Sequence, residues 1–193
     1  MEIAPGAFHL RRYLSLDAQR ALADDCRALV DGPVPAYVPV VRGGGKMHVR
    51  MLCLGRHWNG KTYRYEPVRG DFDGLPAPPL PDAFKALARD AAAAAGMSLD
   101  ADLCILNYYD AGGRMGLHQD KDESPASIAA GVPVVSISIG DAGGFCLGDR
   151  NAAIRSRRGC SNRAMRSCSA GRPGCATTAF RESFPTADLR NSG

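Results

Sequence analysis

The sequence lacks features on which several classes of protein depend. Its longest apolar run is five alanines, residues 91–95, far short of the roughly 20 apolar residues that cross a bilayer. The first residues contain neither the basic cluster nor the apolar core of a secretory leader. Seven cysteines form an odd set with no C-x-x-C pair. We therefore expect a cytoplasmic monomer with free thiols and no membrane partner.

Lysine and large aliphatic residues are nearly absent from the C-terminal fifth of the chain. Residues 151–193 have eight arginines, no lysine and two acidic residues, a charge of +6, whereas residues 1–150 have 16 basic and 18 acidic residues, a charge of −2. The overall charge of +4 therefore comes from this tail, so the main part of the chain is not a general polyanion binder. Among Val, Ile and Leu the tail has only Ile154 and Leu189. We expect this Arg/Ser/Gly/Cys-rich tail to form no strand and to be disordered.

Residues 1–150 have the patterns of one α+β domain. Ser15 followed by an apolar stripe to Val30 predicts a capped helix, and a second helix is predicted from Asp82 to about Ala95, ending at Gly96. Close-set short strands are typical of a sandwich, barrel or jelly roll with the helices outside. Strands are predicted over residues 47–54, 62–65, 103–109, 115–119, 132–139 and 143–147, and turns over residues 43–45 and 58–60.

One short motif has the residue types of a metal site. In His118-Gln119-Asp120 the side chains two apart point to the same face of a strand. An imidazole and a carboxylate so placed are two of the three ligands of the 2-His-1-carboxylate triad, which binds Fe(II) and leaves positions open. The motif alone is weak, because an ordinary polar edge strand has the same appearance.

The surrounding residues make the motif specific. The stretch from Asn107 through Tyr109 and Gly112 to Leu117-His118-Gln119-Asp120-Lys121-Asp122 resembles the AlkB-type alkylation-repair dioxygenases, with the pattern N-x-Y-x-x-G…L-H-x-D-x-D. Pro133 to Gly140 and then Phe145 continue the resemblance, and the opening residues 4–13 are similar as well. The resemblance covers about residues 4–158.

The resemblance implies a double-stranded β-helix (jelly roll) that uses Fe(II), 2-oxoglutarate and O₂ to demethylate alkylated bases in DNA, with RNA as a second candidate. His118 and Asp120 would be the catalytic iron ligands, and Asn107 and Tyr109 would bind 2-oxoglutarate. Residues of a nucleotide-recognition lid, about 43–70, would contact the base together with the 118–122 segment. The substrate-binding residues would be Trp58, which would stack on the base, and Asp122, which would face the exocyclic edge of the base. Tyr63 and Tyr65 would line the nucleotide site.

Each lid residue also has a simpler interpretation. The only tryptophan of a small domain is often a core residue, although Trp58 lies in a Gly/Asn-rich, charged stretch that suits a surface platform. Tyr63 and Tyr65 fall on one face of a predicted strand and could pack there. Asn107 is harder to explain as filler, because an unpaired buried amide is costly.

The chain departs from the family where the second iron-binding histidine is due. No histidine follows His118, since the others are His9, His48 and His57. If the residues from Gly159 are encoded by GC-rich codons, dropping two bases gives LLEPGDALVLGGPAGLRYHGISRIL through about Ser183. That string resembles the missing strands, including a histidine that straddles Thr177 and Thr178. We hypothesise that a frameshift near residues 151–159 replaced the original C-terminal part, leaving the jelly roll incomplete and activity impaired.

Two further readings remain open at this level. A non-catalytic nucleic-acid-binding protein would use Trp58, the tyrosines and the arginine-rich tail, and the absent histidine favours it. A 2-oxoglutarate oxygenase acting on a small molecule would share the H-x-D motif. Trp58 and Asp122 at their positions argue against the small-molecule enzyme.

Overall fold

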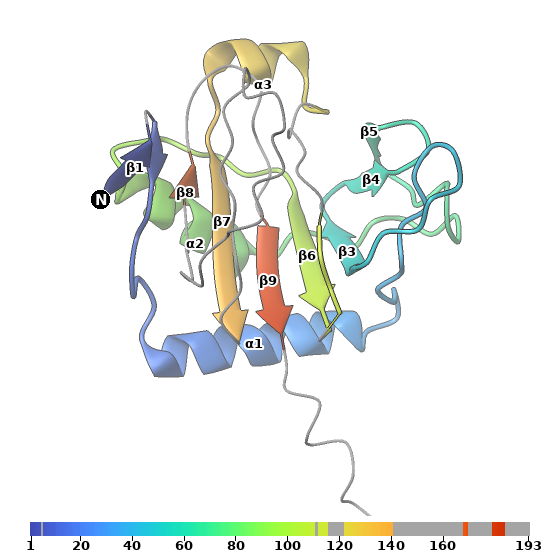
Figure 1. Ribbon diagram of the computed structural model, residues 1–193, viewed down its shortest axis with the longest axis horizontal. Coiled ribbons are helices and arrows are strands. Elements are labelled where there is room, and N and C mark those ends of the chain that lie inside the picture. Colours follow the sequence, from blue (N-terminus) through green and yellow to red (C-terminus); the bar gives the residue numbers. More distant parts are fainter. Residues whose placement is uncertain (5, 111, 116–121, 141–167, 170–178, 184–193) are drawn as a thin grey trace, which may run out of the picture.

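The computed structural model describes residues 1–4, 6–110, 112–115, 122–140, 168–169 and 179–183, and within them two sheets are formed (Figure 1). The larger has the strand order β1-β2-β8-β7-β9-β6-β3, and the smaller pairs β4 with β5. The strands are β1 (Glu2–Ala4), β2 (Ala7–Phe8), β3 (Arg50–Leu54), β4 (His57–Asn59), β5 (Arg64–Glu66), β6 (Cys104–Tyr109), β7 (Val134–Gly140), β8 (Cys168–Ser169) and β9 (Ala179–Ser183). The helices are α1 (Leu16–Val30), α2 (Asp82–Ala93) and α3 (Pro125–Ala130).

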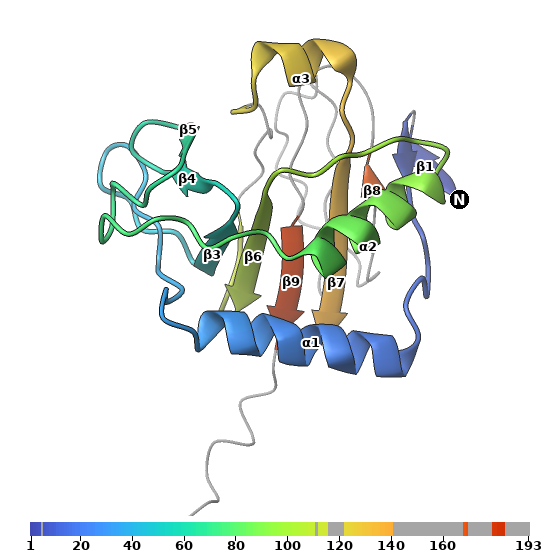
Figure 2. The same cartoon turned by 180° about the vertical axis from the view of Figure 1, so that it is seen from behind.

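The two long helices begin where the sequence predicts them. Ser15 caps α1, and its hydroxyl oxygen accepts a hydrogen bond of 3.1 Å from the amide of Ala18. Helix α2 begins at Asp82, and the chain leaves it through Gly96 at φ +76°. Both helices lie on one face of the main strands, in front of them in Figure 2. None of the helices in the described part of the chain is long and apolar enough to span a membrane.

Alternation along β3 and β6 separates two cores, one on each face of the sheet. The helix-side core joins Leu52, Leu54, Cys104 and Leu106 of these strands to buried residues of both helices and of β7. The lid-side core contains the intervening residues, Met51, Cys53, Leu103 and Ile105, together with Tyr37, and Met47, Trp58 and Tyr65 pack against it. Since residues two apart share a face, Asn107 and Tyr109 lie on the same face as the lid-side core.

Four of the predicted strands are present with shifted ends, and one predicted turn is wrong. Residues 58–60 are not a turn as a whole, because His57–Asn59 form β4 and the turn follows at residues 60–63. Asn59 decides this, since its side-chain oxygen accepts hydrogen bonds from the amides of Lys61 and Thr62 at 2.9 and 3.1 Å. The matched strands are β3, β5, β6 and β7 for the predictions at 47–54, 62–65, 103–109 and 132–139.

The prediction that the tail forms no strand is wrong at two places. Cys168–Ser169 pairs with β2 and β7, and Ala179–Ser183 runs parallel between β6 and β7. Strand ladders are made by backbone amides and carbonyls, which every residue except proline supplies, so a segment poor in apolar side chains can still fill a gap between strands. The disorder predicted for the rest of the tail concerns residues outside those described.

Helix α3 was not predicted, although its signals are in the sequence. Ser124 caps it by accepting from the amide of Ser127 at 3.1 Å, Pro125 opens it, and Gly131 ends it at φ +64°. Its six residues are too few for a helical stripe to be recognised. The strands predicted at 115–119 and 143–147 fall almost wholly outside the described residues. The observed helices and mostly antiparallel strands agree with the predicted α+β class.

Candidate functional site

The predicted lid forms a small aromatic hairpin at the β3 end of the large sheet (Figure 1). Trp58 on β4 stands opposite Tyr65 on β5 in the antiparallel register. The ring of Tyr63, in the turn between these strands, meets the indole edge-on with centroids 5.7 Å apart. Arg42 lies over the ring of Tyr63, with its guanidinium carbon 5.2 Å from the ring centroid. The structure therefore brings the three predicted aromatic residues together on a partly exposed surface.

A hydrogen bond joins the lid to the segment that contains the H-x-D motif. The indole Nε1 of Trp58 donates to Oδ2 of Asp122 at 2.9 Å, between residues 64 apart in sequence. Both side chains are half-buried. An indole can only donate, so the carboxylate is its natural partner, and a charged acceptor strengthens the bond. The predicted base-stacking residue and the predicted base-edge residue thus touch each other.

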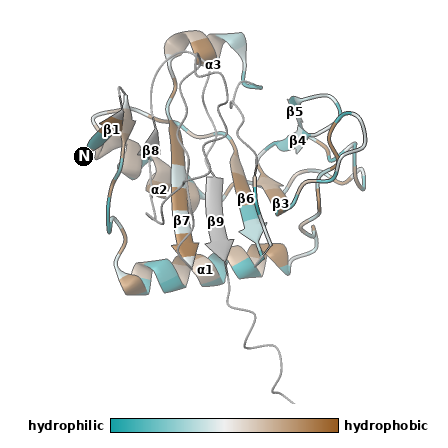
Figure 3. Ribbon diagram, viewed as in Figure 1, coloured by the Kyte–Doolittle hydropathy of each residue, from teal (hydrophilic) through white to brown (hydrophobic). Residues whose placement is uncertain are grey.

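Asn107 and Tyr109 lie near the end of β6, where the strand changes from apolar to polar (Figure 3). Asn107 is buried, and its Oδ1 has no hydrogen-bond partner among the described residues. It pairs in register with Met51 of the lid-side core. A buried amide oxygen left without any partner costs roughly 1–3 kcal/mol, so a donor is expected to meet this atom.

The chain turns sharply after Tyr109 toward the H-x-D segment. A Cβ on Gly113 would lie 2.8 Å from the Cα of Tyr109, so only glycine fits this close approach. Arg114 then bridges to His48, its amide donating to the His48 carbonyl at 3.1 Å. The loop is thereby fixed against the segment that leads into the lid. The side chain of Tyr109 reaches forward, with its hydroxyl 4.0 Å from the sulfur of Met115.

His118 and Asp120, the predicted iron ligands, lie outside the described residues. Among the residues that are described, no three His, Cys, Asp or Glu side chains are grouped to hold a metal ion. The sequence has no later histidine to complete a triad with these two. The donor set for iron is therefore one ligand short of what the resemblance implies.

Beneath the lid is a buried polar cluster that the sequence analysis missed. His57 is fully buried, and its Nε2 lies 2.6 Å from Oδ1 of Asp71, whose side chain is 2% exposed. The hydroxyl of Tyr37 lies 3.3 Å from the same nitrogen, and burial raises the pKa of this phenol well above its ordinary value. Burial likewise raises the pKa of the Cys53 thiol to about 12. Spacing gave no signal for this cluster, because Tyr37 and Asp71 lie outside the named helices and strands and meet His57 of β4 only in the folded chain.

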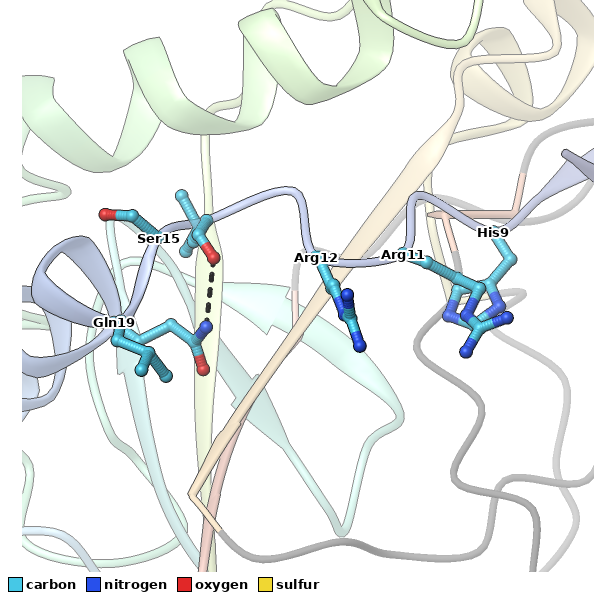
Figure 4. Close-up of a pocket in the computed structure, with 7 residues that line it drawn as sticks. His9, Arg11, Arg12, Ser15 and Gln19 are labelled. Carbon is cyan, nitrogen blue, oxygen red and sulfur yellow. Dashed lines mark hydrogen bonds between the residues drawn. The ribbon is translucent and has the colours of Figure 1, made fainter.

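A cavity of about 570 Å³ lies elsewhere, along the connection between β2 and α1 (Figure 4). It contains none of the predicted site residues. Gln19 closes one side by donating from Nε2 to the carbonyl of Leu14 at 3.0 Å. The lining residues are His9, Arg11, Arg12, Leu14, Ser15, Leu16 and Gln19.

Comparison with known proteins agrees with the resemblance seen in the motifs. The model of the 2OG-Fe(II) oxygenase superfamily matches residues 6–168. The DNA N(6)-methyladenine demethylase ALKBH1C of Arabidopsis thaliana is 42% identical over 164 residues, 77% of this chain and 36% of that protein. The alpha-ketoglutarate-dependent dioxygenase AlkB of Salmonella typhimurium is 38% identical over 141 residues, 72% of this chain and 62% of its own.

A solved structure, that of OsALKBH1, is also similar. It superposes with a TM-score of 0.63 at 32% identity, covering 69% of this chain and 65% of that one. The chain thus spans only about a third of the length of the Arabidopsis relative. These likenesses imply a jelly-roll fold and do not favour a non-catalytic binding protein. The chain belongs to the AlkB-type proteins of the 2OG-Fe(II) oxygenase superfamily.

Proposed function

We propose that this protein's fold serves the Fe(II)- and 2-oxoglutarate-dependent, oxidative demethylation of alkylated bases in DNA, and so DNA alkylation repair. The observation that carries the proposal is the contact between Trp58 and Asp122. It sets an aromatic platform beside a carboxylate, a pair of groups that suits a methylated base. The names of the plant relatives make N6-methyladenine in DNA one substrate to test, and RNA is the alternative polymer.

The lid residues suit a base that has left its stack. A methylated, cationic base stacks well on an electron-rich indole, at about 1 kcal/mol or more when water is excluded. The indole N–H of Trp58 donates to Oδ2 of Asp122, which leaves Oδ1 of the same carboxylate to accept a hydrogen bond from an exocyclic amino group of the base. A lesion that pairs poorly lowers the cost of extruding the base. Tyr63 and Tyr65 would line the remaining side of the base.

On β6, Asn107 and Tyr109 would bind the 2-oxo acid. The side chain of Asn107 is buried on the lid face, and its amide NH₂ can donate a hydrogen bond to a carboxylate. The hydroxyl of Tyr109 can donate to a carboxylate. His118 and Asp120 would hold iron, but two protein ligands bind Fe(II) far more weakly than three. We therefore propose that turnover by this chain is impaired.

The test is 2-oxoglutarate-dependent release of formaldehyde from methylated single-stranded DNA. Two proteins are compared: the present chain, and a variant in which residues from Gly159 to about Ser183 are replaced by the second-frame sequence, which contains the missing histidine. We expect release only from the variant. Robust release by the present chain would disprove the impairment. Absence of release from a folded variant with N6-methyladenine and with ring-methylated bases would disprove the demethylase function.

A further inference from the structure

Trp58 is held from beneath by a buried carboxylate that follows it by 13 residues. Oδ1 of Asp71 contacts Nε2 of His57 at 2.6 Å, and Oδ2 accepts from the amide of Gly60 at 3.1 Å. One carboxylate therefore grips the hairpin on both sides of the tryptophan. The exposed fractions of the His57 and Asp71 side chains are 0% and 2%, so water does not compete for these bonds.

The backbone of Trp58 itself is held at a third point. The hydroxyl of Tyr37 lies 3.3 Å from the Trp58 carbonyl and 3.3 Å from Nε2 of His57. Nδ1 of His57 is buried with no partner among the described residues, so a proton there would be an unsatisfied donor. The ring proton therefore belongs on Nε2, which donates to Asp71. This leaves the Tyr37 hydroxyl to donate to the Trp58 carbonyl.

The anchor for this arrangement is the large sheet. The backbone of Tyr37 exchanges two hydrogen bonds with Met51 of β3, at 2.9 and 2.7 Å. A Cβ on Gly60 would lie 2.8 Å from the carbonyl oxygen of Val40, so the hairpin also sits tightly against its neighbour. Displacement of the Asp71 loop would thus be transmitted directly to Trp58.

The charge of Asp71 is accompanied by a buried cation. Arg69 is 1% exposed, and its guanidinium carbon lies 5.2 Å from the ring centroid of Tyr37 and 5.0 Å from that of Phe72. Its Nη2 lies 3.1 Å from a carboxylate oxygen of Asp73. Buried charges are poor sources of stability compared with apolar packing, and their best-attested role is to fix one geometry. A loop that only had to fold could have used apolar residues here.

We propose that Asp71 is a positioning residue for Trp58, acting through His57 and Gly60 to hold the indole where its Nε1 meets Asp122. The importance of this position for base binding rests on the function proposed above. The hydrogen bond of 2.9 Å between Trp58 and Asp122 tolerates little displacement, because such bonds weaken steeply with distance and angle.

Tryptophan fluorescence tests the proposal without substrate, since Trp58 is the only tryptophan. The variant Asp71→Asn keeps the shape but faces an amide NH₂ toward one of two N–H donors. We expect a red-shifted emission maximum and stronger acrylamide quenching, with the far-ultraviolet circular dichroism unchanged. The control is Asp102→Asn, which makes the same charge change at an exposed carboxylate 3.7 Å from Arg56 and should leave the emission of Trp58 in place. Equal shifts in both variants, or none in Asp71→Asn, would overturn the proposal.

Two further variants keep the test decisive if Asp71→Asn does not fold. His57→Gln retains an N–H donor toward Asp71 and should keep the wild-type emission, whereas Tyr37→Phe removes only the bond to the Trp58 carbonyl and should give a smaller red shift. A wild-type spectrum for Tyr37→Phe and a shifted one for His57→Gln would contradict the geometry. Quenching of the wild-type chain by a methylated oligonucleotide is measured separately. Its absence would count against the proposed function while leaving the positioning role standing.

Discussion

The indole nitrogen of Trp58 donates to the carboxylate of Asp122 at 2.9 Å, across 64 residues of sequence. This bond links the lid hairpin to the segment just after the H-x-D motif. It also makes the emission of the only tryptophan a direct report on the candidate base site.

Removal of the Asp122 carboxylate should free the indole. In Asp122→Ala the Nε1–H of Trp58 loses its acceptor, at a cost of about 1–3 kcal/mol for a bond to a charged group. We expect a red-shifted emission and weaker binding of a methylated oligonucleotide, measured by fluorescence titration. The control is Asp102→Asn, which alters an exposed carboxylate 3.7 Å from Arg56 and should change neither quantity. An unchanged emission in Asp122→Ala would show that the bond does not form in solution.

Replacing Asn107 should separate stability from ligand binding. In Asn107→Leu a buried amide, whose Oδ1 has no partner among the described residues, gives way to an apolar group of similar size, so the free energy of unfolding should stay level or rise by about 1 kcal/mol. Stabilisation by added 2-oxoglutarate, measured as a thermal shift, should disappear.

The matched control for Asn107 is Asn59, which is equally buried but satisfied. Its Nδ2 donates to Glu66 at 2.9 Å and its Oδ1 accepts two backbone amides. Asn59→Leu should therefore destabilise the chain by about 2 kcal/mol or more in urea unfolding. If Asn107→Leu lowers the free energy of unfolding as much as Asn59→Leu does, the Asn107 side chain has a structural partner. It would then not be available to bind 2-oxoglutarate.

Alkaline pH should destabilise the fold through its buried thiols. Burial raises the pKa of Cys53 from 9.0 to about 12, and that of Cys104 well above its ordinary value. The folded state therefore holds these protons more tightly than the unfolded state does. The associated stability is complete below pH 9 and is lost as the pH rises from 9 toward 12. Urea midpoints between pH 8 and 10.5 measure it, and Cys53→Ala should fall less steeply than the wild type. Parallel slopes would contradict the assignment to Cys53.

The sequence predicted the two long helices and the central strands because each had a local signal. Ser15 and Gly96 mark helix ends, and the alternation of residues 103–109 marks a two-faced strand that sorts Asn107 onto the lid side. The aromatic lid residues were found by resemblance, and the structure adds that Trp58 and Asp122 touch. Nothing periodic marked His57, Asp71 and Tyr37, since one lies on β4 and the other two lie outside the named helices and strands, and they meet only after folding. The strands at 168–169 and 179–183 were missed because backbone pairing can proceed without an apolar pattern.

The most direct test of the account is a titration of Trp58 fluorescence with two oligonucleotides that differ in a single methyl group on one base. It uses the present chain and requires no iron. We predict that the methylated strand quenches the emission at a lower concentration than the unmethylated strand does. In Asp122→Ala the two quenching concentrations should lie closer together. Equal quenching by the two strands would contradict the claim that Trp58 and Asp122 form a site for alkylated bases.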